Sequence, residues 1–129
     1  VNLILSNKSL HGDDKEMITA RRTFLNSGHY KILCDALCDS VKSVSEMRTV
    51  ILDAGCGECY YTSEISKSCP EAAVLGIDLS KDALKAGWKR NAGLLLAAAS
   101  VYDIPLADES VDIVVSVFAP MATREFRRI

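Results

Sequence analysis

Apolar runs of strand length alternate with helical patterns through residues 50–129. The runs at 50–52, 73–78 and 111–118 are rich in apolar and β-branched side chains, as is typical of strands buried on both faces of a parallel sheet. The run at 94–100 is ambiguous because its alanines favour a helix, but its length and its position between two crossovers favour a strand. The alternation predicts an α/β fold with a parallel sheet, right-handed crossovers and helices on both faces.

Helical spacing predicts further elements before and between the strands. Acidic residues within 13–16 favour the start of a first helix, and Gly28 is a plausible end for it. Residues 30–44 then repeat apolar side chains over about four turns and lead directly into the first strand. The segments 61–68 and 81–91 follow the first two strands as crossover helices.

Pro70 and Ser80 mark borders of these crossover helices. Pro70 ends the first, and the Ser80 hydroxyl can cap the second. Val1–Leu5 can form a short extended piece. We expect residues 1–46 to form a helical segment that covers the cofactor site and residues 47–129 to form a Rossmann-like core, within one compact unit.

The segment Val50–Thr62 joins a strand to a helix through two closely spaced glycines, Gly55 and Gly57. Glycine takes positive φ and lets the backbone approach a ligand, so this unit is typical of the nucleotide sites of open α/β sheets. A dinucleotide fingerprint would need a third glycine where Tyr60 stands. Asp53, at the end of the strand, would repel a pyrophosphate but suits a positively charged ligand. S-adenosylmethionine, with a sulfonium, an ammonium and no phosphate, therefore fits; the alternative is an ordinary turn whose glycines only relieve strain.

A second acid, Asp78, ends the next strand and is followed by Leu79 and Ser80. An acid about 20 residues after a glycine loop is placed to bind the ribose hydroxyls of a nucleoside. The alternative is that Asp78 caps the following helix. Because Ser80 can take the cap, we expect Asp78 to be free for the ribose.

Composition and charge limit the classes of function. With 129 residues, 49% of them hydrophobic and 25% charged, the sequence suits one globular domain but is short for a complete enzyme of this architecture. The net charge of −2 provides no electrostatic footprint for nucleic acid. No signal peptide or apolar run of membrane-spanning length is found, so we expect no membrane partner. The five cysteines, an odd number, favour reduced thiols and a cytoplasmic protein.

Cys56 and Cys59 form a C-x-x-C pattern, with Cys69 downstream. A zinc site needs four ligands, and no second pair has suitable spacing, since His11 and His29 lie far upstream. A thioredoxin-like pair would open a helix outside any glycine-rich loop. We therefore interpret these cysteines as packing residues and expect no metal in this chain.

Two further pairs of residues are candidates for ligand contact. Arg21 and Arg22 can contact a ligand or an RNA phosphate, but a solvated helix face fits equally well. Tyr61 and Thr62 begin the helix after the glycine loop, where amides and a hydroxyl can meet a carboxylate.

The pattern Asp53-x-Gly55-x-Gly57, with Asp78 at the next strand end, resembles class I S-adenosylmethionine-dependent methyltransferases. A more specific resemblance, to the RlmA family of 23S rRNA (guanine-N1)-methyltransferases, lies mainly upstream. It is carried by Gly12-Asp13, Met17, Ala20-Arg21-Arg22-x-Phe24-Leu25, Gly28-His29-Tyr30, the segment 108–112 and Phe118-Ala119-Pro120. It covers essentially the whole chain, and Val1-Asn2-Leu3 resembles the point where that family leaves its N-terminal zinc-binding module.

The resemblance implies a set of residues that bind S-adenosylmethionine. They are Tyr30, Asp53, Gly55, Gly57, Tyr61, Thr62, Asp78, Leu79 and Ser100. It also implies a 23S rRNA hairpin as the partner of the full-length protein, methylation at N1 of an exposed guanine, and zinc only in the module absent here. No catalytic residue is assigned: guanine N1 must lose a proton, and Asp112 begins the fourth strand, at the wrong end of the sheet for catalysis. A homodimer is left open.

Two residues depart from the usual methyltransferase pattern. Cys59 replaces the third glycine of the loop, which we expect to crowd the ligand slightly, and Ser100 stands where many relatives have an aspartate for the adenine amino group.

The ends of the sequence indicate a fragment. The chain has no starting Met, and residues 124–129 resemble an interrupted helix, so we expect a fold truncated after the fourth strand. Two other classes of function stay open: a methyltransferase acting on a small molecule, which the near-neutral charge would suit, and a cofactor-binding fragment without activity.

Overall fold

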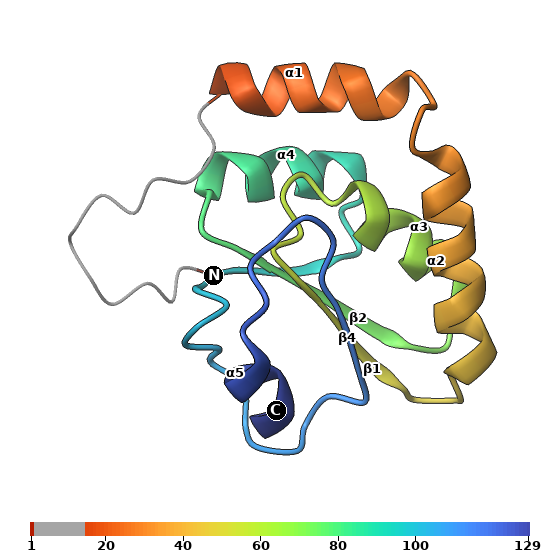
Figure 1. Cartoon of the computed structure of the whole chain (residues 1–129), viewed down its shortest axis with the longest axis vertical. Helices are drawn as coiled ribbons and strands as arrows, with labels where there is room; N and C mark the ends of the chain where they lie inside the picture. The colour runs from red at the N-terminus through yellow and green to blue at the C-terminus, as the bar shows by residue number, and fades with distance from the viewer. Residues whose placement is uncertain (2–14) are drawn as a thin grey trace.

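A four-stranded parallel sheet, with the strand order β3-β2-β1-β4, forms the centre of the molecule (Figure 1). The computed structural model describes Val1 and residues 15–129. The strands are β1 (Val50–Ala54), β2 (Ala73–Asp78), β3 (Leu95–Ala98) and β4 (Ile113–Val115). Because β1 and β2 are parallel neighbours, their carboxyl ends, which carry Asp53 and Asp78, meet at one end of the sheet.

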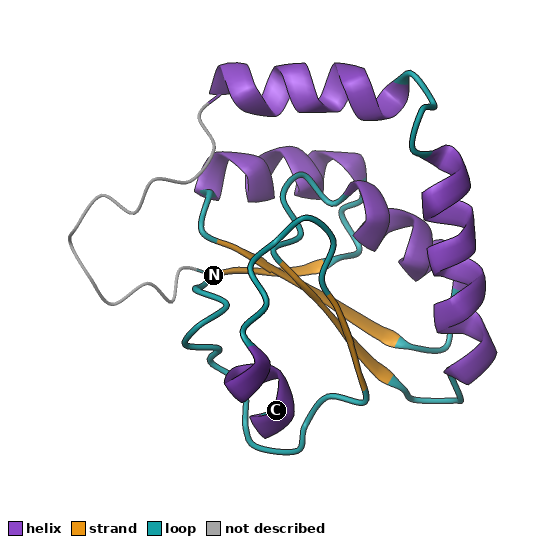
Figure 2. Cartoon of the chain, viewed as in Figure 1, coloured by secondary structure: helices purple, strands orange, loops and turns teal. Residues whose placement is uncertain are grey.

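Helices cover both faces of the sheet, but unequally (Figure 2). They are α1 (Lys15–Asn26), α2 (Lys31–Val44), α3 (Tyr60–Ser68), α4 (Lys81–Arg90) and α5 (Thr123–Arg128). Buried side chains of α2 and α3 pack on Ile51 and Val74 on one face, whereas Leu52 packs on the opposite face near α5. Helix α4 covers the first face beside β3, and α1 lies across α4, away from the sheet (Figure 1). Ile51 and Leu52 are both fully buried because they point to opposite, covered faces.

The predicted α/β fold, with a parallel sheet and helices on both faces, is confirmed. The cap at Ser80 is also confirmed, since its hydroxyl accepts a hydrogen bond from the Ala83 amide at 3.2 Å. The predicted start of the first helix near Asp13, and the extended piece at 1–5 apart from Val1, lie outside the described residues.

The fourth strand is shorter than predicted. It ends at Val115 instead of Phe118, because residues 117–120 leave the sheet and turn towards the glycine loop, with a left-handed φ of 56° at Phe118. The connection from β3 to β4, residues 99–112, is irregular. Its apolar side chains, including Val101 and Ile104, pack with α5 on the second face.

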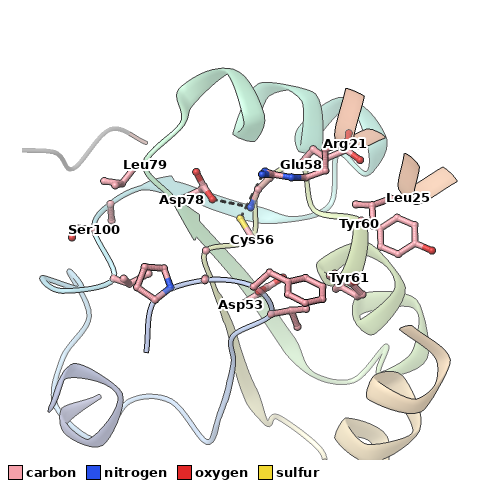
Figure 3. Close-up of a pocket in the computed structure, with 18 of the residues that line it drawn as sticks. Arg21, Leu25, Asp53, Cys56, Glu58, Tyr60, Tyr61, Asp78, Leu79 and Ser100 are labelled. Atoms are coloured by element: carbon pink, nitrogen blue, oxygen red, sulfur yellow. Dashed lines mark hydrogen bonds between the residues drawn. The ribbon is translucent and has the colours of Figure 1, made fainter. Parts of the chain in front are cut away.

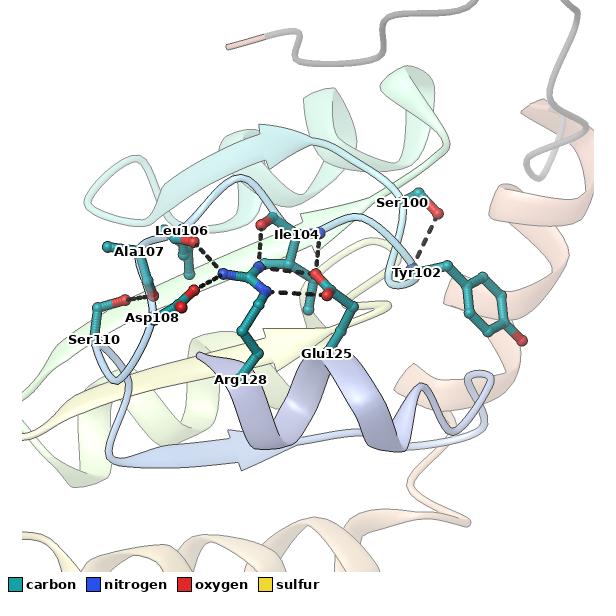
Figure 4. Close-up of polar contacts among 9 residues, drawn as sticks. All are labelled: Ser100, Tyr102, Ile104, Leu106, Ala107, Asp108, Ser110, Glu125 and Arg128. Carbon is teal, nitrogen blue, oxygen red and sulfur yellow. Dashed lines mark hydrogen bonds and ion pairs between the residues drawn. The ribbon is translucent and has the colours of Figure 1, made fainter.

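Arg128 fastens α5 to this irregular connection (Figure 4). Its guanidinium donates to the backbone oxygens of Ile104 and Leu106, at 2.7 and 2.9 Å, and forms ion pairs with Asp108 and Glu125. The Glu125 carboxylate accepts in addition from the Ile104 amide at 2.9 Å. These hydrogen bonds, led by those from Arg128, lower the pKa of Glu125 to about 2.

Replacing Arg128 with methionine should lower the thermal unfolding midpoint by several degrees, because two backbone oxygens and two carboxylates lose their donor. The matched control is Arg127→Met at the exposed neighbouring position, which should leave the midpoint almost unchanged. The Glu125 contribution should be complete above pH 4.5, its ordinary pKa, and be lost as the pH falls through about 2. Equal midpoints for the two variants in a calorimetric scan would show that the Arg128 contacts do not stabilise the fold.

Candidate functional site

A cavity of about 500 Å³ opens at the carboxyl ends of the strands. It is lined by the end of α1, the glycine loop, the residues that follow β2 and β3, and the segment 117–120. In Figure 3, Leu79 and Ser100 lie at one end of the labelled group, Leu25 and Tyr60 lie at the other, and Cys56 lies between. All the residues predicted to bind a cofactor line this cavity except Thr62.

The glycine loop needs its two glycines for conformation and for space. Gly55 and Gly57 have φ values of 88° and 54°, which other residues rarely adopt. A Cβ atom added to Gly55 would lie 2.4 Å from the Cβ of Ala119, so a side chain there would collide with the segment after β4. The amides of Gly55 and Cys56 both donate to the Ile77 carbonyl at 2.9 Å, which ties the loop to β2.

The sequence predicted that Asp78 is free, but its carboxylate already accepts backbone hydrogen bonds in the structure. One carboxylate oxygen accepts from the Gly57 amide at 2.9 Å, a contact marked in Figure 3, and the other accepts from the Ser80 amide at 2.8 Å. Asp78 therefore braces the glycine loop against the end of β2. Because each carboxylate oxygen can accept more than one hydrogen bond, both retain capacity for a ligand hydroxyl.

Asp53 is a buried carboxylate held by Thr62. Its side chain lines the cavity although only 2% of the residue is exposed, and it accepts a hydrogen bond from the Thr62 hydroxyl at 2.5 Å. Burial raises the pKa of Asp53 to about 6, the Thr62 hydrogen bond lowers it, and the negative charge of Asp78 raises it. Thr62 is fully buried and lies behind the cavity wall, so its hydroxyl positions Asp53 instead of facing a ligand.

Replacing Thr62 with valine should raise the pKa of Asp53 further above about 6, because the hydroxyl that stabilises the carboxylate is removed. Ser63→Ala is the matched control, since the Ser63 hydroxyl is buried with no hydrogen-bond partner among the described residues. The pKa can be followed from the carboxyl carbon of Asp53 in an NMR titration. An unchanged midpoint in Thr62→Val would contradict the assigned contact.

Tyr61 and Tyr30 form part of the cavity wall near α1 and α2. The Tyr61 hydroxyl is buried and has no hydrogen-bond partner among the described residues, and burial raises its pKa to about 12, so it stays protonated. The Tyr30 ring packs edge-to-face on Phe118, with centroids 5.5 Å apart, and also contacts Phe24. At the other end of the cavity, the Ser100 hydroxyl accepts from the Tyr102 amide at 3.2 Å.

Glu58 is a functional candidate that the sequence pattern did not identify. It lines the cavity, yet its side chain is only 2% exposed and forms ion pairs with Arg22 at 2.5 Å and Arg90 at 2.7 Å. Arg22 donates as well to the Ala86 carbonyl. Arg22 therefore joins α1 to the glycine loop and to α4, a structural role that neither sequence interpretation included. The sequence offered one signal for Glu58: it is the only charged residue between Gly55 and Tyr60, the start of α3.

The cysteines of the loop pack as interpreted from the sequence. Their sulfur atoms lie 3.8 Å apart and both residues are buried. The hydrogen bond with the Cys59 thiol, together with burial, raises the pKa of Cys56. Cys59 has a φ of 63° and is fully buried against Gly87, where an added Cβ would lie 2.3 Å from its sulfur. Our expectation that Cys59 crowds a ligand is therefore wrong, because its side chain points into the packing beside α4. Within Val1 and residues 15–129, no cluster of three or more metal-ligating side chains occurs.

Asp112 lies at the other end of the sheet, as expected. Its carboxylate accepts from the Val50 amide, at the start of β1, at 2.8 Å. Among the described residues, no helix has the length and apolar character needed to cross a membrane.

Residues 51–128 match a protein family described as "Methyltransferase domain". Over its full length the chain is 30% identical to the 23S rRNA (guanine(748)-N(1))-methyltransferase of Streptomyces fradiae, of which it covers 47%. Two further relatives carry provisional names as 23S rRNA (guanine-N(1)-)-methyltransferases. The protein of Micromonospora griseorubida is 33% identical to this chain, which covers 49% of it, and that of Bacillus subtilis (strain 168) is 36% identical, with 43% of it covered. The resemblance to 23S rRNA (guanine-N1)-methyltransferases that the sequence indicated is confirmed by these identities. The chain spans about half the length of these curated relatives.

Solved structures with the same fold include several methyltransferases. Streptomyces venezuelae DesVI is 22% identical with a TM-score of 0.63, over 84% of this chain and 45% of that one. The plantazolicin methyltransferase BpumL, solved with SAH, is 20% identical with a TM-score of 0.66, over 81% of this chain and 42% of that one. These similarities establish the Rossmann-like fold of class I S-adenosylmethionine-dependent methyltransferases.

Proposed function

This chain belongs to the methyltransferase domain family, and from this premise we propose that it binds S-adenosylmethionine and serves methylation of guanine N1 in 23S rRNA. The observation that carries the cofactor assignment is the pair of carboxylates, Asp53 and Asp78, on either side of a glycine loop whose own backbone lines the cavity. The substrate assignment is supported by 30–36% identity to relatives named for this activity.

The residues of the cavity fit this cofactor in charge. Asp53 forms no ion pair among the described residues, and its raised pKa reflects a buried negative charge that a cationic ligand would stabilise. The Tyr61 hydroxyl, protonated and without a partner among the described residues, offers a donor in the same wall. A phosphate-rich ligand would face two carboxylates here, so a sulfonium nucleoside is the better match.

We assign complementary roles to the two ends of the cavity. At one end, Asp78 would accept hydrogen bonds from the ribose hydroxyls, Leu79 would pack on the adenine, and Ser100 would meet its amino group. At the other end, Tyr30 and Tyr61 would border the amino-acid portion. Gly55 and Gly57 let the backbone approach the ligand, and Thr62 acts through Asp53.

Helix α1 would cover the bound cofactor. Phe24, Leu25 and Tyr30, from α1 and the turn after it, line the cavity. The ion pair between Arg22 and the buried Glu58 fixes this helix on the loop. The helical segment 15–46, as far as the structure describes it, would then act as a cover over the core formed by residues 47–129.

When bound, S-adenosylmethionine supplies an activated methyl group, so the residues of this chain mainly have to orient it and exclude water. Guanine N1 lies on the Watson–Crick edge, and the base must be unpaired or flipped to reach the cavity. Its N1 proton must also leave. We assign no general base to the described residues.

The test is methyl transfer from tritiated S-adenosylmethionine to 23S rRNA that lacks the modification, with the intact natural protein. Label should enter one guanine, and reverse transcription should stop there because a methyl group on N1 blocks base pairing. If the label enters a different base, guanine N1 is not the acceptor. If no RNA is labelled while calorimetry still detects binding of S-adenosylmethionine, the rRNA substrate is rejected and the cofactor assignment is retained.

A small-molecule acceptor is the second candidate, favoured by charge. The chain has 15 basic and 17 acidic residues, and RNA affinity depends strongly on basic contacts to phosphates. Transfer to an amino sugar or a peptide under conditions that leave rRNA unlabelled would support this candidate.

A further inference from the structure

Aromatic side chains from three separate segments meet at the cavity. Phe24 belongs to α1, Tyr102 follows β3, and Phe118 follows β4; all three line the cavity. They are 50%, 66% and 78% exposed, respectively. Exposed aromatic surface gathered at a cavity indicates a binding surface more often than scattered apolar residues do.

Phe118 is the most unusual of the three. Its φ of 56° lies in the left-handed region, which a bulky side chain adopts only at a cost and which is found mainly where the surroundings enforce it. The enforcing contacts are visible: Ala119 packs directly against Gly55, and the Tyr30 ring contacts the Phe118 ring edge-to-face. The fold thus holds a strained residue in place and leaves its ring largely exposed, a combination that does not serve core packing.

The position of Phe118 in the cavity indicates which part of a bound substrate its ring could contact. Leu79 and Ser100 lie at one end and Leu25 and Tyr60 at the other (Figure 3). A cofactor bound with its nucleoside at the first end and its amino-acid portion at the second would have its transferable methyl group between them. Ala119 lies against Gly55, and the Phe118 ring lines the same cavity, where an approaching acceptor could contact it.

We propose that Phe118 is the platform on which a planar purine acceptor stacks during methyl transfer. This inference rests on the proposed function and adds the residue of the pocket that selects a planar acceptor. A flat aromatic face gains stacking energy with a flat heteroaromatic base and gains much less with a puckered sugar ring. Phe118 is therefore a specificity residue, with Tyr30 as the support of its ring.

The test uses 2-aminopurine riboside, a planar base whose fluorescence falls when it stacks, added to the chain saturated with S-adenosylhomocysteine. The wild-type chain should quench the fluorescence with saturation. Phe118→Leu should weaken binding roughly 5- to 150-fold, and Phe118→Trp should retain it. Trp88→Leu is the matched control, because Trp88 is a 56% exposed aromatic outside the cavity lining.

A second variant separates stacking from backbone effects. Phe118→Gly removes the ring but relieves the left-handed strain, so this variant should unfold at the same temperature as the wild type or higher while losing the purine. Binding of the riboside by Phe118→Leu or Phe118→Gly as tightly as by the wild type would overturn the proposal. Displacement of the riboside by glucosamine at equal concentration would also overturn it.

The cofactor is titrated separately by calorimetry. S-adenosylhomocysteine binding without any quenching in the wild-type chain rejects the purine platform alone. Absence of S-adenosylhomocysteine binding rejects the proposed function, and this inference with it.

Discussion

Replacing Asp78 with alanine should weaken S-adenosylmethionine binding roughly 10- to 150-fold. The hydrogen bonds that the ribose hydroxyls would lose are charge-assisted, and a hydrogen bond to a charged group contributes roughly 1.5–3 kcal/mol to binding. The substitution also removes the acceptor for the Gly57 amide, so the glycine loop loses its brace at the same position. Both effects act in the same direction.

The matched control is Asp112→Ala. Asp112 likewise accepts a backbone hydrogen bond, from the Val50 amide, but it does so at the far end of the sheet. Calorimetric titration of both folded variants should show reduced affinity only for Asp78→Ala. If the two variants bind the cofactor equally well, the ribose assignment of Asp78 is wrong.

Replacing Asp53 with asparagine should have opposite effects on stability and on binding. The folded-state pKa of Asp53, about 6, lies above its ordinary value of 3.8 because the carboxyl is buried. A raised pKa means that this group favours the folded state most below pH 3.8, and that the benefit is lost as the pH rises through about 6. Above that pH the buried charge costs about 2–3 kcal/mol, which Asp53→Asn should recover.

The same substitution should weaken S-adenosylmethionine binding roughly 10-fold or more at neutral pH, since the anion that faces the cationic ligand is removed. Asparagine keeps an acceptor for the Thr62 hydroxyl, so the local geometry should be preserved. Urea unfolding at pH 7.5 and at pH 4 gives the first readout: the stability gain should be present at the higher pH and nearly absent at the lower.

Asp82→Asn, at a more exposed acid on α4, serves as the control and should change neither stability nor binding appreciably. Asp53→Asn with no stability gain at pH 7.5 would show that the buried carboxylate carries no such cost.

The sequence predicted those features that local chemistry determines. The strand ends, the two glycines and the cap at Ser80 each follow from neighbouring residues, so the position of Asp53 and Asp78 beside one loop could be predicted. The predicted cap at Ser80 is present, whereas Asp78, predicted to be free, accepts two backbone hydrogen bonds. The amides that bind Asp78 belong to the loop and to its own turn, and the approach of Gly57 to β2 depends on how the whole loop folds.

The features that the sequence did not reveal depend on contacts between distant segments. Arg22 and Glu58 meet only because α1 lies across α4 beside the glycine loop. Phe118 was expected within a strand by its apolar neighbours, but the packing of Ala119 on Gly55 turns that segment out of the sheet. Cys59 could not be assigned to packing against Gly87 before the position of α4 was known.

The most direct measurement of the central claim is a crystal structure of this chain with S-adenosylhomocysteine. We expect the nucleoside between Leu79 and Ser100, with both ribose hydroxyls within hydrogen-bond distance of the Asp78 carboxylate. The amino-acid portion should lie beside Tyr61, and the sulfur atom should lie near Gly55 and Asp53. Density for the ligand outside this cavity, or a ribose that points away from Asp78, would contradict the proposed cofactor site.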